Sequence, residues 1–352
     1  MLTTIDPVED SRWDAFIKKH PESTIFHHSA WAQVLRERYQ REPIYHVMEN
    51  DRREIVAAIP LFSIQSALTG NRLVCLPCSE YCFPLSDSRE SLLPLIDAVK
   101  AEVDNGGVSF WEVRGWGGLV VPEELGLVEN PYYLRHVANL DGDPEKLRAK
   151  LYHESYHLRR NLKKAEKSGI VVHEAESEDD LRRFHRLTEI TRKRLRLLPW
   201  PYEFLQAIYR HVVVPGHGFL LLAELGDKAI AGSMYFCFGD TTTLKFNASD
   251  PKYVQYRGNY LVTWKAVERA CLEGYRQFDF GICNPENLGL ARFKSYWGTE
   301  ATVFPYYYYP ARQGVGSVSQ SNFVYQAYTA FNRLVPEIAL KLVSKALYRH
   351  LG

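Results

Sequence analysis

The sequence predicts two α/β domains in tandem, each built from a mixed, mainly antiparallel twisted sheet flanked by helices. Its 352 residues are enough for two domains of ordinary size. Hydrophobic residues make up 46% and charged residues 24%, which is the balance of a globular protein. The same order of elements (helices, antiparallel strands, a helix and a further strand) is predicted twice along the chain. We infer the duplication from that order, because the two halves show no strong residue-by-residue repeat.

The first domain is predicted over residues 1–144. One helix starts at Ser29, a good N-cap residue, and a later helix ends at the run Asn105-Gly106-Gly107. Apolar runs separated by polar turns predict the strands. The predicted helices cover residues 8–20, 29–40 and 89–104, and the predicted strands cover 45–48, 55–64, 72–76 and 108–113.

The second domain is predicted over residues 145–310, because the segment Asp141-Gly142-Asp143-Pro144 interrupts the pattern. A basic helical region over 145–168 opens it. The strands that follow are predicted at 171–174, 219–225, 228–238, 241–248 and 278–281, and the helices at 178–196, 202–211 and 261–273.

Residues 311–352 are predicted to form a loop and a C-terminal amphipathic helix. Two interpretations remain open for that helix. Packing on its own protein is favoured, and contact with a membrane surface is the alternative, because basic residues flank the apolar stripe.

Composition excludes several classes of protein. A net charge of +1 argues against a chain-wide electrostatic surface for nucleic acid. The first residues lack the basic and apolar regions of a signal peptide, and no apolar run reaches the roughly 18 residues that cross a bilayer. We therefore expect a cytoplasmic protein with reduced cysteines.

Three cysteines, Cys75, Cys78 and Cys82, lie close together, and the first two have CxxC spacing. No second CxxC pair or His pair follows at the distance of a zinc site. Structural thiols are favoured over a metal or redox centre, and no metal is expected.

One stretch of the second domain suggests an anion site. A predicted strand ends near Asp250, a loop carries Gln255-x-x-Gly258, and a helix follows directly. Free backbone N–H groups and the helix dipole favour an anion, such as a phosphate, at a helix N-terminus.

The motif Gln255-x-x-Gly258-x-Tyr260 resembles the pyrophosphate loop of GNAT acyltransferases, except that Tyr260 stands where the family carries a small residue. Other stretches resemble the Fem aminoacyltransferases, and more closely the FemAB-like proteins encoded with exopolysaccharide and exosortase systems. The segments that carry this resemblance, which spans nearly the whole chain, are residues 26–31, 59–62, 158–165, 274–281 and 289–298.

The resemblance implies two tandem GNAT-type domains, of which the second is catalytic, and acyl transfer to an amine. Fem enzymes build peptidoglycan cross-bridges from aminoacyl-tRNA, so the implied donor is either an acyl-coenzyme A or an aminoacyl-tRNA. The donor contacts carried over from the loop motif are Gln255, Arg257, Gly258 and Asn259. The same resemblance places Lys294 at the reaction centre with Phe293 beside it.

Physical chemistry supports two catalytic candidates. A fixed cation such as Lys294 stabilises the negative charge that forms on the acyl oxygen when an amine attacks; the alternative is a surface lysine beside a buried aromatic. Asp279 is predicted in a strand, on the side opposite to Phe278 and Phe280. It is either a general base for the amine or a structural acid paired with a lysine or arginine.

The expected acceptor is a nucleotide- or lipid-linked sugar or peptide precursor. The basic region over 146–167 either faces the phosphates of such a precursor or of tRNA, or is a solvated helix face. The long helical hairpin of many tRNA-using Fem enzymes is not predicted. The candidate substrate contacts are Asn247, Ser249, Tyr253, Phe293, Tyr296, Trp297 and, from the first domain, His28.

Three hypotheses for the function therefore remain open. The first is a coenzyme A-dependent N-acyltransferase of cell-wall or exopolysaccharide precursors. The second is an aminoacyl-tRNA-dependent peptidoglycan transferase of the Fem kind. The third is a catalytically degenerate GNAT pair that serves as a binding or scaffold protein in an export system.

Overall fold

The computed structural model describes residues 1–40, 42–66, 70–310 and 344. The loop and helix predicted over 311–352 therefore lie outside the described residues, apart from Ser344. The described chain divides into two compact units. Unit 1 contains residues 1–132 and 304–310, and unit 2 contains residues 133–303 and Ser344. The predicted boundary at 144/145 thus falls inside unit 2.

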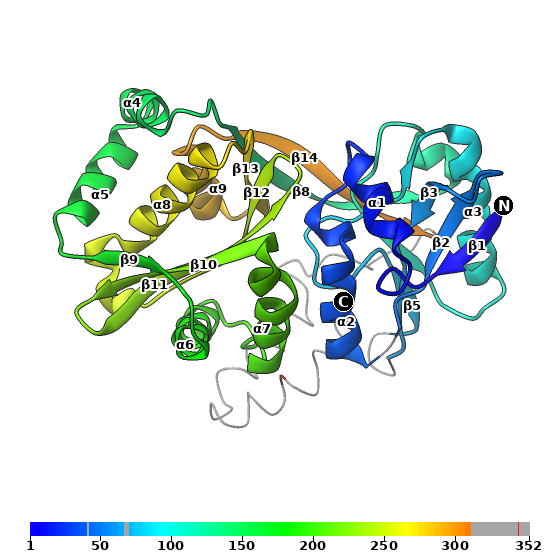
Figure 1. Cartoon of the computed structure of the whole chain (residues 1–352), viewed down its shortest axis with the longest axis horizontal. Coiled ribbons are helices and arrows are strands. Elements are labelled where there is room, and N and C mark those ends of the chain that lie inside the picture. The colour runs from blue at the N-terminus through cyan, green and yellow to red at the C-terminus, as the bar shows by residue number, and fades with distance from the viewer. Residues whose placement is uncertain (41, 67–69, 311–343, 345–352) are drawn as a thin grey trace. The chain divides into compact units, whose positions relative to one another are not determined.

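Unit 1 contains two groups of paired strands and three α-helices (Figure 1). The first group is antiparallel in the order β1-β2-β3-β6, and the second has the order β4-β5-β7-β14 with β5 parallel to β7. The strands are β1 (Leu2–Ile5), β2 (Tyr45–Glu49), β3 (Ile55–Ile59), β4 (Phe62–Ile64), β5 (Arg72–Val74), β6 (Leu85–Ser86), β7 (Trp111–Arg114) and β14 (Glu300–Tyr309). The helices are α1 (Arg12–Lys19), α2 (Ser29–Tyr39) and α3 (Arg89–Asp104), with short 3-10 turns η1 (Ile25–His27) and η2 (Pro122–Leu125).

Unit 2 is built on strands in the order β8-β13-β12-β11-β10-β9. Helices α5 and α8 lie on one side of this sheet, and α6 and α7 lie on the other (Figure 1). The strands are β8 (Val128–Asn139), β9 (Val171–Glu174), β10 (Gly218–Leu225), β11 (Lys228–Phe238), β12 (Thr241–Ser249) and β13 (Gln277–Cys283). The helical elements are α4 (Pro144–Glu154), α5 (Tyr156–Glu166), α6 (Glu178–Arg194), α7 (Tyr202–Ile208), η3 (Tyr209–His217), η4 (Pro251–Tyr256), α8 (Gly258–Leu272) and α9 (Leu288–Ser295).

Local sequence explains where several helices of unit 2 begin. Ser177 and Asp180 form a capping box at the start of α6, in which each side chain accepts a backbone N–H of the other residue. Asp143 caps α4, and Pro144 fills its first position. Ser155 caps α5 and so divides the predicted helical region 145–168 in two. These caps orient helices whose apolar faces then pack on the sheet.

Strands β12 and β13 separate partway along the sheet. They pair in parallel over Thr241–Thr243 and Gln277–Asp279. Beyond those residues β12 remains paired with β11, and β13 remains paired with β8. The register between β13 and β8 shifts between Asp279 and Ile282, which is a β-bulge. Diverging parallel strands are the usual place for a ligand in such sheets, and polar residues lie at this point.

Three elements near this separation were not predicted. β8 includes Pro131, and Pro within an apolar run argues against a strand. α9 has only eight residues and contains Gly289, a poor helix former. β14 contains Pro305 and a run of four tyrosines that does not alternate with polar residues. Tertiary pairing overrides these weak local signals.

Membrane-spanning helices are not found in the described ranges, because none of the helices there is both long and apolar enough.

Candidate active site

The loop motif from which we predicted an anion site lies at the start of α8. Arg257 caps the helix with a left-handed φ of 64°. Gly258 is buried, and a Cβ at that position would lie 3.1 Å from the Cβ of Ala231 on β11. The glycine therefore lets the helix start close to the sheet. The side chain of Asn259 donates a hydrogen bond to Ser249 at the end of β12, at 3.2 Å.

Three arginines bring positive charge to His157 on α5, and two of them also act on Tyr260 in the first turn of α8. Arg160 on α5, Arg257 before α8 and Arg292 on α9 all act on His157, whose pKa is lowered first by desolvation and then by these three charges. Arg257 and Arg160 also oppose the rise in the pKa of Tyr260 that burial and Tyr296 cause. The positive field comes from three elements, so it depends on the fold and is suited to an anionic ligand.

Aromatic rings surround the same place. Tyr296 stacks on His157 with ring centres 4.5 Å apart. The ring of Tyr260 meets Phe293 edge-on at 5.3 Å and lies parallel to Trp297 at 6.4 Å. Trp297 is buried in the core of unit 2. Phe293 and Tyr296 are half-buried, so they can contact a ligand while the core holds them in place.

Lys294 is buried, with 3% of its surface exposed. Its ammonium donates hydrogen bonds to the carbonyl oxygens of Gly281 at 2.9 Å and Ile282 at 3.0 Å. Both carbonyls belong to the β13 bulge, where Gly281 has a φ of +70°. The bulge interrupts the register of β13 with β8 just before Ile282, and the ammonium binds both carbonyls there.

Asp279 is fully buried at the same bulge. One carboxylate oxygen accepts hydrogen bonds from Nε and Nη2 of Arg135, at 2.8 and 2.7 Å. The other oxygen accepts the backbone N–H of Gly281 at 2.7 Å. This is the geometry of the structural acid paired with an arginine, which was one of the two roles open for Asp279.

The sequence did not point to a neighbouring pair, His136 and Cys283. The Nε2 of His136 lies 3.4 Å from the Cys283 Sγ, and its Nδ1 lies 3.2 Å from the Thr299 hydroxyl. Burial lowers the pKa of His136, the charge of Lys294 lowers it further, and Asp279 opposes both effects. Burial raises the pKa of the Cys283 thiol, and Lys294 opposes that rise. The imidazole of His136 is therefore neutral near pH 7. The sequence analysis missed this pair because β8, the strand that carries His136, has no sequence pattern that predicts a strand.

The remaining predicted residues have diverse surroundings. Asn247 is exposed and donates a hydrogen bond to the Ser233 hydroxyl at 2.8 Å. Gln255 is exposed in η4, and Tyr253 packs near Tyr256 with ring centres 6.3 Å apart. His28 belongs to unit 1, where its Nδ1 accepts the backbone N–H of Ala30 and caps α2.

The three clustered cysteines of unit 1 form no disulfide, and Cys75 and Cys82 are buried. Across the described ranges there is no group of three or more His, Cys, Asp or Glu side chains that could hold a metal ion.

Residues 153–295 match the family model described as an acetyltransferase (GNAT) domain. The match begins at the end of α4 and includes the start of α8, the β13 bulge and Lys294. No curated protein matches the chain.

Several solved structures share the fold. FemX is 15% identical with a TM-score of 0.68, and the alignment covers 93% of this chain and all of FemX. L-PGS from Bacillus licheniformis is 13% identical, with a TM-score of 0.54 and coverage of 94% and 97%. A conserved protein of unknown function from Bacteroides thetaiotaomicron is 12% identical, with a TM-score of 0.60 and coverage of 88% and 99%. The predicted fold class and the resemblance to GNAT acyltransferases are confirmed, and FemX shares the fold.

Proposed function

We propose that this protein is an N-acyltransferase that transfers an acyl or aminoacyl group to an amine of a cell-wall or exopolysaccharide precursor in the cytoplasm. The observation that carries the proposal is the buried ammonium of Lys294, fixed by two carbonyls at the bulge where β12 and β13 separate. A buried cation held in place needs little reorganisation when charge forms beside it.

The start of α8 holds the phosphates of the donor in this proposal. Gln255, Arg257, Gly258 and Asn259 supply the loop, and Arg160 and Arg292 add charge from neighbouring helices. Tyr260, which replaces a small residue of the family motif, packs its ring on Phe293 and Trp297. The ring is thus held against the core of unit 2 beside the loop, and acyl-coenzyme A is the donor that we favour.

Acyl transfer then proceeds by direct attack. The acceptor amine forms a C–N bond to the acyl carbon, and the ammonium of Lys294 stabilises the negative charge on the acyl oxygen. The bond to the leaving sulfur or oxygen breaks, and that atom takes up a proton. Asp279 is committed to Arg135 and Gly281, so it acts as a positioning residue that shapes the bulge, and water accepts the proton of the amine.

The acceptor lies against polar and aromatic groups around the same strands. Asn247 and Ser249 offer polar contacts at the end of β12, and Tyr253, Phe293, Tyr296 and Trp297 offer aromatic surface to a sugar or peptide. His28, which lies in unit 1, stays a predicted substrate contact. Contact of residues 311–352 with a membrane surface remains a prediction.

A second donor, aminoacyl-tRNA, is favoured by one observation. Helix α5 and its C-cap residue expose a row of cations that includes one of the three arginines above, namely Arg159, Arg160, Lys163, Lys164 and Lys167. Such a row can contact several phosphates of an RNA backbone.

Calorimetry with acetyl-coenzyme A and a gel shift with bulk tRNA separate the two donors. Binding of tRNA through phosphates must weaken steeply as salt rises. Failure of both probes to bind would leave the scaffold hypothesis in place.

The catalytic test uses Lys294→Met in an acyl-transfer assay with the donor that binds and an amine panel. Loss of one stabilising group should reduce kcat by about 10²–10³-fold. Lys265→Met is the matched control, because Lys265 is exposed on α8 and pairs with Glu268. Unchanged kcat in a folded Lys294→Met protein would contradict the assignment, and far-UV circular dichroism verifies the fold.

A further inference from the structure

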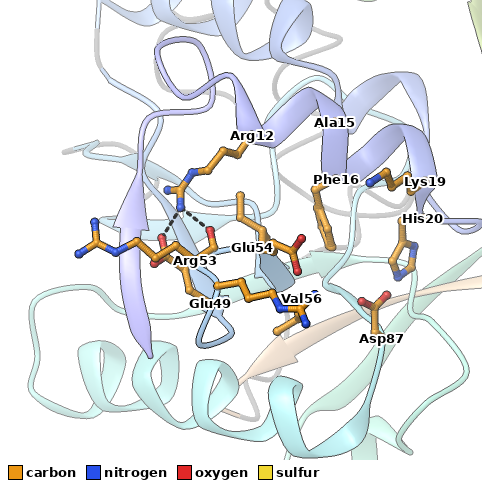
Figure 2. Close-up of a pocket in the computed structure, with 12 residues that line it drawn as sticks. Arg12, Ala15, Phe16, Lys19, His20, Glu49, Arg53, Glu54, Val56 and Asp87 are labelled. Atoms are coloured by element: carbon orange, nitrogen blue, oxygen red, sulfur yellow. Dashed lines mark hydrogen bonds and ion pairs between the residues drawn. The ribbon is translucent and has the colours of Figure 1, made fainter.

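A surface pocket in unit 1 is separate from the proposed catalytic domain. It has a volume of about 730 Å³. This lies within the range of roughly 300–1,000 Å³ usual for small-molecule sites. Its walls come from α1, the β2–β3 hairpin and the residue after β6, so segments distant in sequence converge on it (Figure 2). Ala15, Phe16, Ile55 and Val56 supply its apolar surface.

Arg12 fixes the frame of this pocket. Its guanidinium donates hydrogen bonds to Asp10 at 2.9 Å, to Glu49 at 2.8 Å and to the carbonyl of Arg53 at 2.7 Å. The hydrogen bonds that Arg12 donates to Asp10 and Glu49 raise its pKa. Helix α1 is thereby tied to the β2–β3 hairpin, and the pocket is formed before any ligand arrives.

Three other charged side chains of the pocket make few hydrogen bonds or ion pairs within the part of the chain that the structure describes. Lys19 and Asp87 line the pocket, yet no hydrogen bond or ion pair of either side chain is found among the described residues. Glu54 accepts one hydrogen bond, from the Asn50 amide at 2.8 Å. Figure 2 shows the carboxylates of Glu54 and Asp87 turned toward the space beside Phe16, with Lys19 across that space.

We propose that this pocket binds a zwitterionic amino compound, either a free α-amino acid or a short peptide, with an apolar side chain. Glu54 and Asp87 receive the ammonium group, Lys19 and the nearby Arg52 receive the carboxylate, and Phe16 and Val56 contact the apolar side chain. A zwitterionic ligand pairs with both the acidic and the basic side chains of the pocket. A simple anion would be repelled by the acidic side chains, and a simple cation by the basic ones. This site goes beyond the proposed transfer reaction.

The experiment titrates the full chain with L-leucine by calorimetry, up to about 10 mM, which reaches millimolar dissociation constants. N-acetyl-L-leucine lacks the ammonium group and L-leucinamide lacks the carboxylate, so both should bind at least several-fold more weakly. Leu-Gly-Gly distinguishes the sources: tighter binding than leucine identifies a peptide site, and weaker binding identifies a free amino acid site. No binding of either leucine or the tripeptide would overturn the proposal.

Variants test the position of the site. Asp87→Asn and Lys19→Gln each remove one charge and should weaken leucine binding by about fivefold or more. Asp51→Asn and Lys18→Gln are matched controls, because both residues are exposed and neither lines the pocket. Equal effects of the test and control variants, or equal binding of the two blocked leucines, would overturn the proposal. Lys294→Met should leave leucine binding unchanged, which keeps this result separate from the fate of the proposed reaction.

Discussion

Charged side chains are buried at the β13 bulge of unit 2, whereas they are exposed in the pocket beside α1 in unit 1. In the bulge, Asp279 and Lys294 are buried, and they bond Arg135 and the backbone of Gly281 and Ile282. In the pocket, Lys19 and Asp87 remain exposed to water. An unpaired charge costs much free energy when it is buried, so buried charges are paired within the protein. Exposed charges are solvated by water and can therefore stay unpaired until a ligand binds. The same residue types therefore support the fold in one unit and offer recognition in the other.

The largest expected effect is a loss of stability when a buried, paired charge is removed, compared with the removal of an exposed one. Asp279→Asn leaves Arg135 without its counter-charge and should lower the free energy of unfolding by about 3 kcal/mol. Asp87→Asn is the matched exposed change and should stay within about 0.5 kcal/mol of the original protein. Urea unfolding of both variants measures the difference. Similar losses in the two variants would break the comparison between buried and exposed charges.

A pH effect tests burial within unit 1. His27 is fully buried, its Nε2 lies 3.0 Å from the Phe83 carbonyl, and its Nδ1 accepts the N–H of Thr24. Desolvation lowers its pKa to about 4, from an ordinary value of 6.5.

Between these two pH values the unfolded state binds more protons than the folded state. The stability of unit 1 should therefore fall as pH drops from 6.5 to 4, by on the order of 2–3 kcal/mol, with no further loss from this group below pH 4. Unfolding of the original protein and of His27→Gln across this range measures the effect. The proposal that His27 is the source is wrong if the variant keeps the same pH dependence.

The smallest effect concerns two glycines near the proposed site. A Cβ at Gly258 would lie 3.1 Å from the Ala231 Cβ, whereas at Gly289 its nearest neighbour would be the Asn287 side chain at 3.9 Å. Gly258→Ala should cost about 1 kcal/mol by crowding β11 and should weaken donor binding, whereas Gly289→Ala should be neutral or slightly stabilising. Thermal unfolding and donor titration compare the pair, and equal behaviour would remove the close approach of α8 as an explanation for Gly258.

Sequence patterns predicted several elements closely, and for physical reasons. The predicted helix 89–104 matches α3, because a capping serine and a glycine stop mark both of its ends. Strands 171–174 and 228–238 match β9 and β11, and the turn Gly226-Asp227 after β10 marks where β11 begins. In contrast, β8 and α9 have weak local signals, and they form because long-range pairing and packing stabilise them.

The candidate site divides in the same way. The loop before α8 could be predicted from the sequence because the strand, the glycine and the helix N-terminus follow one another along the chain. The pairing of Asp279 with Arg135 joins residues 144 positions apart, and the contact of His136 with Cys283 joins residues 147 positions apart. Contacts at that separation leave no local pattern.

By itself, the sequence determined the fold class, most helix starts and the loop motif, because these depend on periodicity and on neighbouring residues. Only the tertiary structure decided that Lys294 is buried against the β13 bulge, that Asp279 is held by Arg135, and that Lys19 and Asp87 share a pocket. The reason is physical: burial and charge pairing depend on which distant segments come into contact, and the free energies of these contacts depend on the packing of the whole unit.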